Sequence, residues 1–425
     1  MENKIILSPY RWVVLLALMA VTAVVELQWL AHAAVARAAA AFYAGQFDPD
    51  SLVNIDFLAL SYMLIYLIVS IPASYVIDTR GIKTGLGIGC VLTAVFSLIK
   101  GFGAQSFLTV VFAQIGLAVA QPFILNAVTA LSARWFPLEE RGTAAGLAIL
   151  AQYLGIIAAM GISPQLVVSS PDNPAYGSGI DSMLMTYGVI SALTAFFAFL
   201  LIKDRPGHSP SKEGFVHTKF TQGFRYIFGR KDMLITLVLF FIGLGIFNAV
   251  SSMVDSISGS LGVSDSDGMI GVMMITGGVI GALIFPILSD KFRKRKLFLV
   301  ITMAGMIPAM IGLAFSDRLF GSSMSVYIAV LCSAFLLGFF VMSAGPIGFQ
   351  YAAEVTYPAP ESSSQGLLLL VGQISGITFT ALMSIRSNMF LKGIMMLFAV
   401  FAVFAFVLVL MLKESPMILS GDDQE

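Results

Sequence analysis

The sequence predicts an all-α membrane protein in which twelve transmembrane helices form two pseudo-symmetric six-helix lobes. Of its 425 residues, 58% are hydrophobic and only 11% are charged, against roughly 25% charged residues in soluble proteins. The apolar residues form long continuous segments, and motifs of the first half recur in the second. This composition excludes a disordered chain and most soluble enzymes, because a soluble domain could not bury so much apolar surface.

Each predicted span is close to the ~20 mostly apolar residues needed to cross ~30 Å of hydrocarbon. In chain order the spans are Trp12–Ala36, Phe57–Ile77, Gly85–Phe102, Phe107–Ala130, Gly142–Ile162, Met183–Ile202, Leu234–Val254, Met269–Leu288, Leu297–Phe315, Ser325–Ala344, Leu367–Met383 and Gly393–Leu412. The first is too long for a cleavable signal peptide, and it carries Glu26 and Trp29 in its interior. The segments do not alternate as the strands of a β-barrel would.

The positive charges predict the orientation. With a cytoplasmic N-terminus, most of the 24 Lys and Arg residues fall on the inner side. The outer loops near Asp48, Asp172 and Asp265 contain neither residue beyond Arg37, and Lys100 at the end of the third span counts as an outer charge. The positive-inside rule therefore predicts a multi-pass protein of the plasma membrane, in a bacterium the inner membrane, with both termini cytoplasmic. The formal net charge of +0 offers no basic field for nucleic acid.

A polar segment divides the chain into two repeated halves. We expect lobes at residues 1–202 and 233–425, joined by a cytoplasmic linker at 203–232 with a short amphipathic helix near Phe215–Phe228. Three residues of the first half recur at the same spacing in the second: Pro137, Gln152 and Gly155 match Pro358, Gln373 and Gly376. This arrangement resembles the major facilitator transporters, whose substrate site lies near the middle of the membrane between repeated halves.

Short basic loops follow the second and eighth spans. The first resembles the loop motif of the major facilitator family: Asp78, Gly81 and Lys83 match, Ser74 replaces the first Gly, and Arg80 is displaced by one position. By this resemblance the loops hold one conformation shut. The candidate gating residues are Asp78, Arg80, Lys83, Arg134, Arg141, Asp290, Arg293 and Glu361. The alternative is that basic loops only enforce topology.

The first span carries Glu26, the only acidic residue placed deep in any predicted span. Helical steps of three and four residues place Glu26, Trp29, Ala33 and Arg37 on one stripe. Because an ionisable group is costly in hydrocarbon, such a residue is by default a functional candidate, here for proton coupling. A structural carboxylate, paired or reached by water, is the alternative. His32 has no second ligand at metal spacing, so we expect no metal and no cofactor.

Gln152 and Gln373 are neutral donor–acceptor groups at equivalent places in the two repeats. We expect both to face the central cavity and contact substrate, although Gln also bonds helix to helix in membranes. Asn126, Asn248 and Tyr153 are further substrate candidates, for each of which packing is an equal alternative.

Several motifs resemble the feline leukaemia virus subgroup C receptor-related transporters, which include haem and choline/ethanolamine carriers. They are Gln28–Trp29, Ala120–Asn126, Arg134–Pro137, Gln152–Gly155 and, as the longest match, Glu354–Leu367 followed by Gln373. In that family a first-span Trp and a seventh-span Tyr enclose a quaternary ammonium, assisted by one Gln from each lobe. The resemblance places Trp29, Gln152 and Gln373 in these roles and puts Asn248 where the Tyr stands, with Gln28 beside Trp29.

The sequence therefore predicts a monomeric secondary transporter that moves a small polar or amphipathic organic solute, such as an amine or cation, by alternating access. Proton coupling through Glu26 is one interpretation; a choline/ethanolamine uniporter or a haem exporter is the alternative. A channel is disfavoured by the repeated lobes and paired loops, and a receptor by the lack of a large soluble segment. An enzyme is disfavoured because the spans lack a catalytic set.

Overall fold

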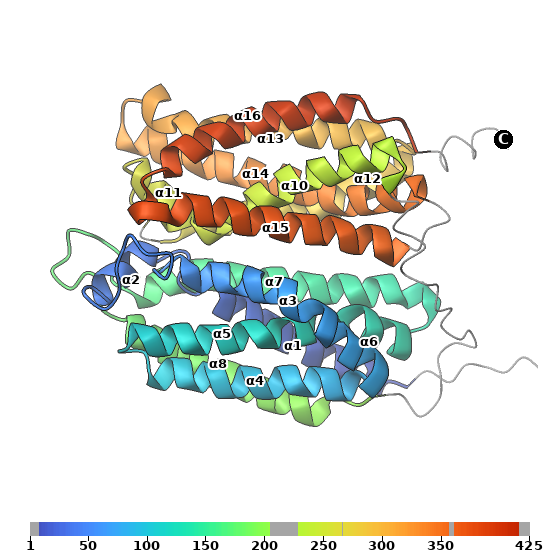
Figure 1. The fold of residues 1–425 in the computed structure, drawn as a ribbon, viewed down its shortest axis with the longest axis horizontal. Helices are drawn as coiled ribbons and strands as arrows, with labels where there is room; N and C mark the ends of the chain where they lie inside the picture. Colours follow the sequence, from blue (N-terminus) through green and yellow to red (C-terminus); the bar gives the residue numbers. More distant parts are fainter. Residues whose placement is uncertain (1–7, 205–227, 266, 357–360, 416–425) are drawn as a thin grey trace, which may run out of the picture. The chain divides into compact units, whose positions relative to one another are not determined.

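The computed structural model describes residues 8–204, 228–265, 267–356 and 361–415, and within these ranges the regular elements are α-helices (Figure 1). The first eight are α1 (Tyr10–Leu30), α2 (Ala36–Phe42), α3 (Phe57–Arg80), α4 (Ile82–Phe102), α5 (Phe107–Leu125), α6 (Ala127–Trp135), α7 (Leu138–Leu166) and α8 (Ile180–Leu201). The others are α10 (Lys231–Ser252), α11 (Val254–Ser260), α12 (Met269–Phe292), α13 (Arg295–Leu319), α14 (Ser323–Val355), α15 (Glu361–Asn388) and α16 (Leu391–Leu410).

Within the described residues, 12 helical segments are long and apolar enough to cross a membrane, as the sequence predicts. The chain divides into two units, the first containing α1–α8 and the second α10–α16, and we call these lobe 1 and lobe 2. In lobe 1, α1 packs mainly on α7 and α8, while α4 packs on α8 and α5. In lobe 2, α14 packs on α12 and α13, and α10 packs on α15.

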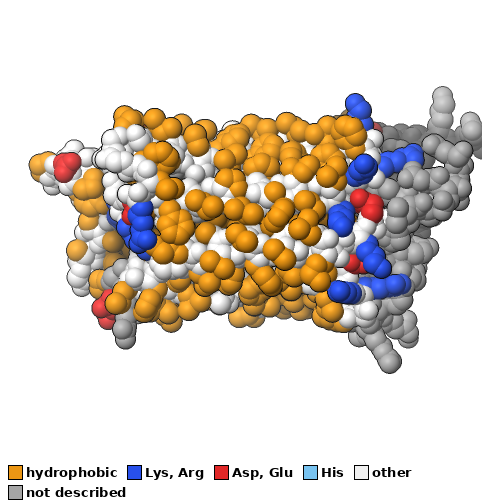
Figure 2. Space-filling view, turned by 90° about the horizontal axis from the view of Figure 1, so that it is seen from above, with side chains coloured by type: hydrophobic (Ala, Val, Ile, Leu, Met, Phe, Trp, Pro, Cys, Tyr) orange, Lys and Arg blue, Asp and Glu red, His pale blue; other side chains and the backbone are white. Residues whose placement is uncertain are grey.

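Large apolar side chains on the outside of these helices remain uncovered by protein. Ile71 and Leu108 are 76% and 78% exposed, and in lobe 2 Ile287 is 65% exposed. Hydrophobic side chains cover the middle of the face seen in Figure 2, whereas Lys, Arg, Asp and Glu lie toward its two ends. Contiguous apolar surface of this kind is compatible with lipid and not with water.

Glycine lets neighbouring helices approach closely inside each lobe. The added Cβ of a residue at 155 would collide with the backbone of Ala23, so Gly155 brings α7 against α1. In lobe 2 Gly338 lies against the backbone of Met274, which joins α14 to α12. Small residues serve this purpose in membranes because van der Waals packing and hydrogen bonding, rather than the hydrophobic effect, associate the helices.

Two predicted spans are interrupted in the structure. The first was expected to continue to Ala36, but α1 ends at Leu30 and turns precede α2, so the predicted stripe ends at Trp29 and does not reach Arg37. The fourth is divided at Asn126 into α5 and α6. At the first break, the side chains of Lys100 and Gln114 donate hydrogen bonds to the Gln28 carbonyl oxygen. At the second, the side chain of Asn126 donates a hydrogen bond to the Ser70 carbonyl oxygen of α3. The amphipathic helix expected near residues 215–228 lies outside the described residues except for Phe228, which is helical.

Candidate functional site

Glu26 lies at the centre of a buried polar group within lobe 1. Its side chain is 0% exposed, and Gln121 of α5 donates a hydrogen bond of 2.8 Å from Nε2 to Glu26 Oε1. Gln152 of α7 also reaches this carboxyl group. Among the described residues Glu26 forms no ion pair, and its Oε2 has no partner with full hydrogen-bond geometry. The carboxyl group is therefore held by neutral amides rather than by a fixed positive charge.

Aromatic side chains surround the same carboxyl group. Tyr62 and Tyr66 of α3 and Tyr153 of α7 all interact electrostatically with Glu26. One turn further along α1, the half-buried Trp29 stacks on Tyr62, with ring centroids 6.5 Å apart and an interplanar angle of 26°. A carboxyl group near aromatic rings is an arrangement suited to an organic cation.

The two duplicated glutamines lie in similar surroundings in their own lobes. Gln152 on α7 and Gln373 on α15 are both partly buried. Gln373 Oε1 is inaccessible to solvent and has no hydrogen-bond partner among the described residues. On α10, Asn248 is 7% exposed. An unsatisfied buried amide oxygen is costly in apolar surroundings, so a ligand that donates a hydrogen bond to Gln373 would remove this cost.

Two of the substrate candidates are instead engaged by protein groups. Asn126 Oδ1 accepts from the Tyr66 hydroxyl at 2.8 Å, and Nδ2 donates to Ser70 Oγ at 2.9 Å and Ser74 Oγ at 3.0 Å. This bonding ties the break between α5 and α6 to α3, which is the helix-to-helix role that the sequence left open.

Gln28 is likewise turned into the interior of lobe 1. Its Nε2 donates to Ser191 Oγ of α8 at 3.1 Å, and its Oε1 accepts from Lys100 Nζ of α4 at 3.0 Å. Both ends of the amide are thus bonded to protein groups.

The burial of Lys100 and two neighbours of Glu26 are not predicted by the sequence. Lys100, which the sequence places among the outer charges, is 0% exposed, because its long side chain turns back toward α1. Its position two residues before the end of α4 gave no signal of this direction. Gln121 and Tyr62 gave a usable signal, since both are polar residues inside apolar segments, but only tertiary structure brings them to Glu26.

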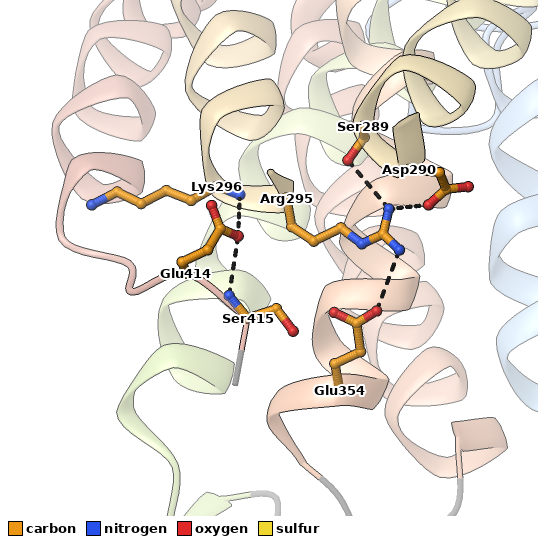
Figure 3. Close-up of polar contacts among 7 residues, drawn as sticks. All are labelled: Ser289, Asp290, Arg295, Lys296, Glu354, Glu414 and Ser415. Atoms are coloured by element: carbon orange, nitrogen blue, oxygen red, sulfur yellow. Dashed lines mark hydrogen bonds and ion pairs between the residues drawn. The ribbon is translucent and has the colours of Figure 1, made fainter. Parts of the chain in front are cut away.

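The basic loop of lobe 2 contains a network of ion pairs (Figure 3). Arg295 is 6% exposed; it pairs with the predicted gating residue Asp290 and donates from Nη2 to Glu354 Oε1 of α14 at 3.4 Å. Beside it, the backbone N–H of Lys296 donates to Glu414 Oε1 at 3.0 Å. Arg293, the gating candidate in this loop, is exposed and has a positive φ of 52°. The loop is thereby fastened to α14 and to the chain after α16.

Lobe 1 has a related contact on Asp204. This carboxylate lies 3.6 Å from Arg134 Nη1 and accepts from the backbone N–H of Lys83 at 3.3 Å. Gly81, with φ of 94°, brings the start of α4 against Asp204. Arg80 and the side chain of Lys83 are exposed. The side chains of three gating candidates lie outside the described atoms: Asp78, Arg141 and Glu361.

No cluster of three or more His, Cys, Asp and Glu residues able to hold a metal occurs in the described part of the chain. His32 is 3% exposed, and neither of its ring nitrogens has a hydrogen-bond partner among those residues.

The twelve apolar spans of the described residues define a multi-pass membrane protein, and lobe 1 holds a buried polar group in its interior. The profile of the Major Facilitator Superfamily matches residues 21–380. The chain therefore belongs to the Major Facilitator Superfamily.

The chain is similar to several transporters of animals. It is 29% identical over 386 residues to solute carrier family 49 member A3 of Xenopus tropicalis, a match that covers 88% of this chain and 77% of that protein. It is 27% identical to the choline/ethanolamine transporter FLVCR1 of Felis catus, covering 88% and 67%. An uncharacterised MFS-type transporter of Caenorhabditis elegans is also 27% identical, and here the chain spans 64% of the relative's length.

Solved structures show the same fold. A bacterial homologue of the human lysosomal transporter Spinster, inward-facing and unoccupied, superposes with a TM-score of 0.73 at 15% identity, covering 95% of this chain and 96% of the other. A D-xylose–proton symporter gives a TM-score of 0.69 at 15% identity, covering 96% and 99%.

Proposed function

We propose that the protein is a secondary active transporter of a small organic amine or cation and that Glu26 is its coupling carboxyl group. The observation that carries the proposal is the burial of Glu26 among neutral amides and aromatic rings, without an ion pair among the described residues. A carboxylate left in this state is costly, and either a bound cation or a bound proton removes the cost. The two ligands would therefore compete for one group.

The aromatic pair supports a cationic substrate. Trp29 and Tyr62 present their ring system one turn from Glu26, and a cation over an aromatic face gains roughly 0.5–2 kcal/mol, more when desolvated. Gln152 supplies a neutral amide on the same lobe, and Gln373 and Asn248 are the candidate substrate contacts of lobe 2. The relatives named choline/ethanolamine transporters point to the same chemical class.

The basic loops are proposed as gates. Arg295 with Asp290 and Glu354 in lobe 2, and Arg134 with Asp204 in lobe 1, connect loops to helices through contacts that can form in one state and break in another. We further propose a plasma-membrane location with cytoplasmic termini, based on the distribution of Lys and Arg.

The test uses purified protein in proteoliposomes and labelled choline, ethanolamine and simple amines. Wild-type protein is expected to show saturable uptake that an imposed proton gradient accelerates. Glu26→Gln should abolish the response to the proton gradient while exchange of substrate remains measurable. Asp317→Asn, which removes a carboxylate from a partly exposed ion pair, is the matched control and should behave like wild type.

A uniporter of choline-like substrates is the second candidate, favoured by the stacked Trp29 and Tyr62. It predicts that uptake of labelled choline follows its own gradient alone and ignores the proton gradient in the wild type. That result would remove Glu26 from coupling but keep the aromatic pair in the substrate site. Absence of saturable flux for every amine tested would remove the substrate class itself.

A further inference from the structure

Lys100 is the one fully buried lysine among the described residues, and the transport proposal above gives it no role. It lies on α4 with 0% exposure. Its Nζ donates to two oxygens of one residue, Gln28 Oε1 at 3.0 Å and the Gln28 carbonyl oxygen at 3.3 Å. Within the described part of the chain it forms no ion pair, although a buried ammonium normally has an acidic partner.

The compensation comes from the end of α1. This helix stops at Leu30, whose carbonyl oxygen accepts from the backbone N–H of Ala33 at 3.0 Å in the turn that follows, whereas side chains reach the carbonyl oxygens of Gln28 and Trp29. Such an end carries partial negative charge, which a cation stabilises. Lys100 Nζ is bonded to one of these carbonyl oxygens, that of Gln28.

Gln114 of α5 completes the same cap. Its Nε2 lies 3.3 Å from the Gln28 carbonyl oxygen, 3.5 Å from that of Trp29 and 3.0 Å from that of Leu58 in α3. Side chains from α4 and α5 thus bond the carbonyl groups at the end of α1. In hydrocarbon these bonds are required, because no water is present to satisfy the backbone carbonyl groups.

The turn that is capped in this way carries Trp29. Its indole Nε1 donates to the Ala59 carbonyl oxygen at 3.0 Å, and its ring stacks on Tyr62. The direction of the ring therefore depends on where the last turn of α1 is held. Glu26 lies one turn earlier, beyond the capped carbonyl groups, and is bonded instead by Gln121.

We propose that Lys100 is a positioning residue for the substrate site: its ammonium group fixes the last turn of α1 and thereby the ring of Trp29. The inference rests on the proposed function only in assigning Trp29 to the substrate. The geometric part, that Lys100 and Gln114 set the direction of the indole, is independent of what the protein carries.

The experiment exploits the three tryptophans of the chain. Trp12→Phe with Trp135→Phe leaves Trp29 as the sole tryptophan, so that its emission maximum and its quenching by acrylamide report the position of the ring. Lys100→Met keeps the length of the side chain but removes the charge and the donors. We expect an altered emission maximum and at least about twofold stronger quenching, since a helix end without its cap frays.

Binding of labelled choline is measured on the same variants in detergent. Lys100→Met should weaken binding by about tenfold, because the ring is no longer preorganised, whereas Lys100→Arg should retain most of the affinity. Ser97→Ala is the control on the same helix: it removes a hydrogen bond of 3.1 Å to the Gly188 carbonyl oxygen and should lower the melting temperature without moving Trp29.

An unchanged Trp29 spectrum and quenching in folded Lys100→Met protein would overturn the proposal. If that variant does not fold, Gln114→Leu decides, since it removes the second half of the cap and is expected to shift Trp29 in the same direction. If the spectrum shifts but neither wild type nor variant binds choline, the positioning role stands and the proposed substrate class fails.

Discussion

The ion pair between Arg295 and Glu354 gives a prediction whose magnitude follows from burial. The two side chains are 7% and 11% exposed, and Arg295 bonds Glu354 Oε1, while Oε2 has no hydrogen-bond partner among the described residues. Replacing Arg295 by Met leaves that carboxylate buried and uncompensated, which costs about 3–5 kcal/mol for buried pairs. The pairing with Asp290 adds little, because that side chain is 57% exposed and exposed pairs contribute about 0–1 kcal/mol.

The reverse change should be milder. Glu354→Gln leaves Arg295 with Asp290 and a bond of 3.3 Å to Ser289 Oγ, so the guanidinium remains partly compensated. The double variant removes both charges and should recover most of the stability lost in Arg295→Met. The coupling energy in this double-mutant cycle is then expected to be about 2–3 kcal/mol.

Denaturant unfolding in mixed detergent micelles measures these free energies. Lys392→Met is the matched control, because it also removes one cation from an ion pair, with Asp317 at 2.8 Å, but Lys392 is 48% exposed. It should cost less than about 1 kcal/mol. If Arg295→Met costs no more than Lys392→Met, burial does not set the strength of the network and the reasoning is refuted.

Two further predictions test the ends and the packing of lobe 2. Burial raises the pKa of Asp265 from 3.8 to about 6, although it accepts hydrogen bonds from the N–H groups of Met269 and Ile270. The folded protein thus holds this proton more tightly than the unfolded chain, so the associated stability is complete below pH 3.8 and disappears as the pH rises through about 6. Asp265→Asn should therefore remove the change of melting temperature across that pH window. An unchanged pH profile in this variant would show that Asp265 is not the group responsible. Gly338→Leu should prevent α14 from approaching α12 at Met274 and thereby lower the melting temperature. Gly345→Leu is the control and should lower it less, because an added Cβ there meets no atom within 4 Å. Equal effects of the two changes would contradict close packing of α14 on α12 at Met274.

The fold was predictable because it depends on long-range composition rather than on single contacts. Spans of the required length and the repeated Pro137 and Pro358 motifs suffice to indicate twelve helices in two halves. The helix ends were less predictable. Hydropathy continues past Leu30, and nothing in the local sequence shows that Lys100 and Gln114 bond the carbonyl groups at the end of α1.

The candidate site was predictable only for residues that are costly wherever they lie. Glu26 stands out because a carboxyl group in an apolar segment requires an explanation. Gln28 and Asn126 looked equally suitable as substrate contacts, yet their amides are bonded to Ser191, Lys100, Tyr66 and serines of α3. Which partners a neutral amide finds is decided by tertiary packing, and residue type carries no information about it.

Glu26, Lys100 and Glu354 differ in how their charges are compensated, and this difference supports the different roles proposed for them. Glu354 is paired with Arg295, so its charge is fixed as long as the loop is docked, as a gate requires. Lys100 is compensated by the end of α1, so its charge is tied to one backbone position. Glu26 is met only by neutral donors, which stabilise either protonation state incompletely. Of the three, only Glu26 gains from an arriving cation or proton, and that is the property that a coupling group needs.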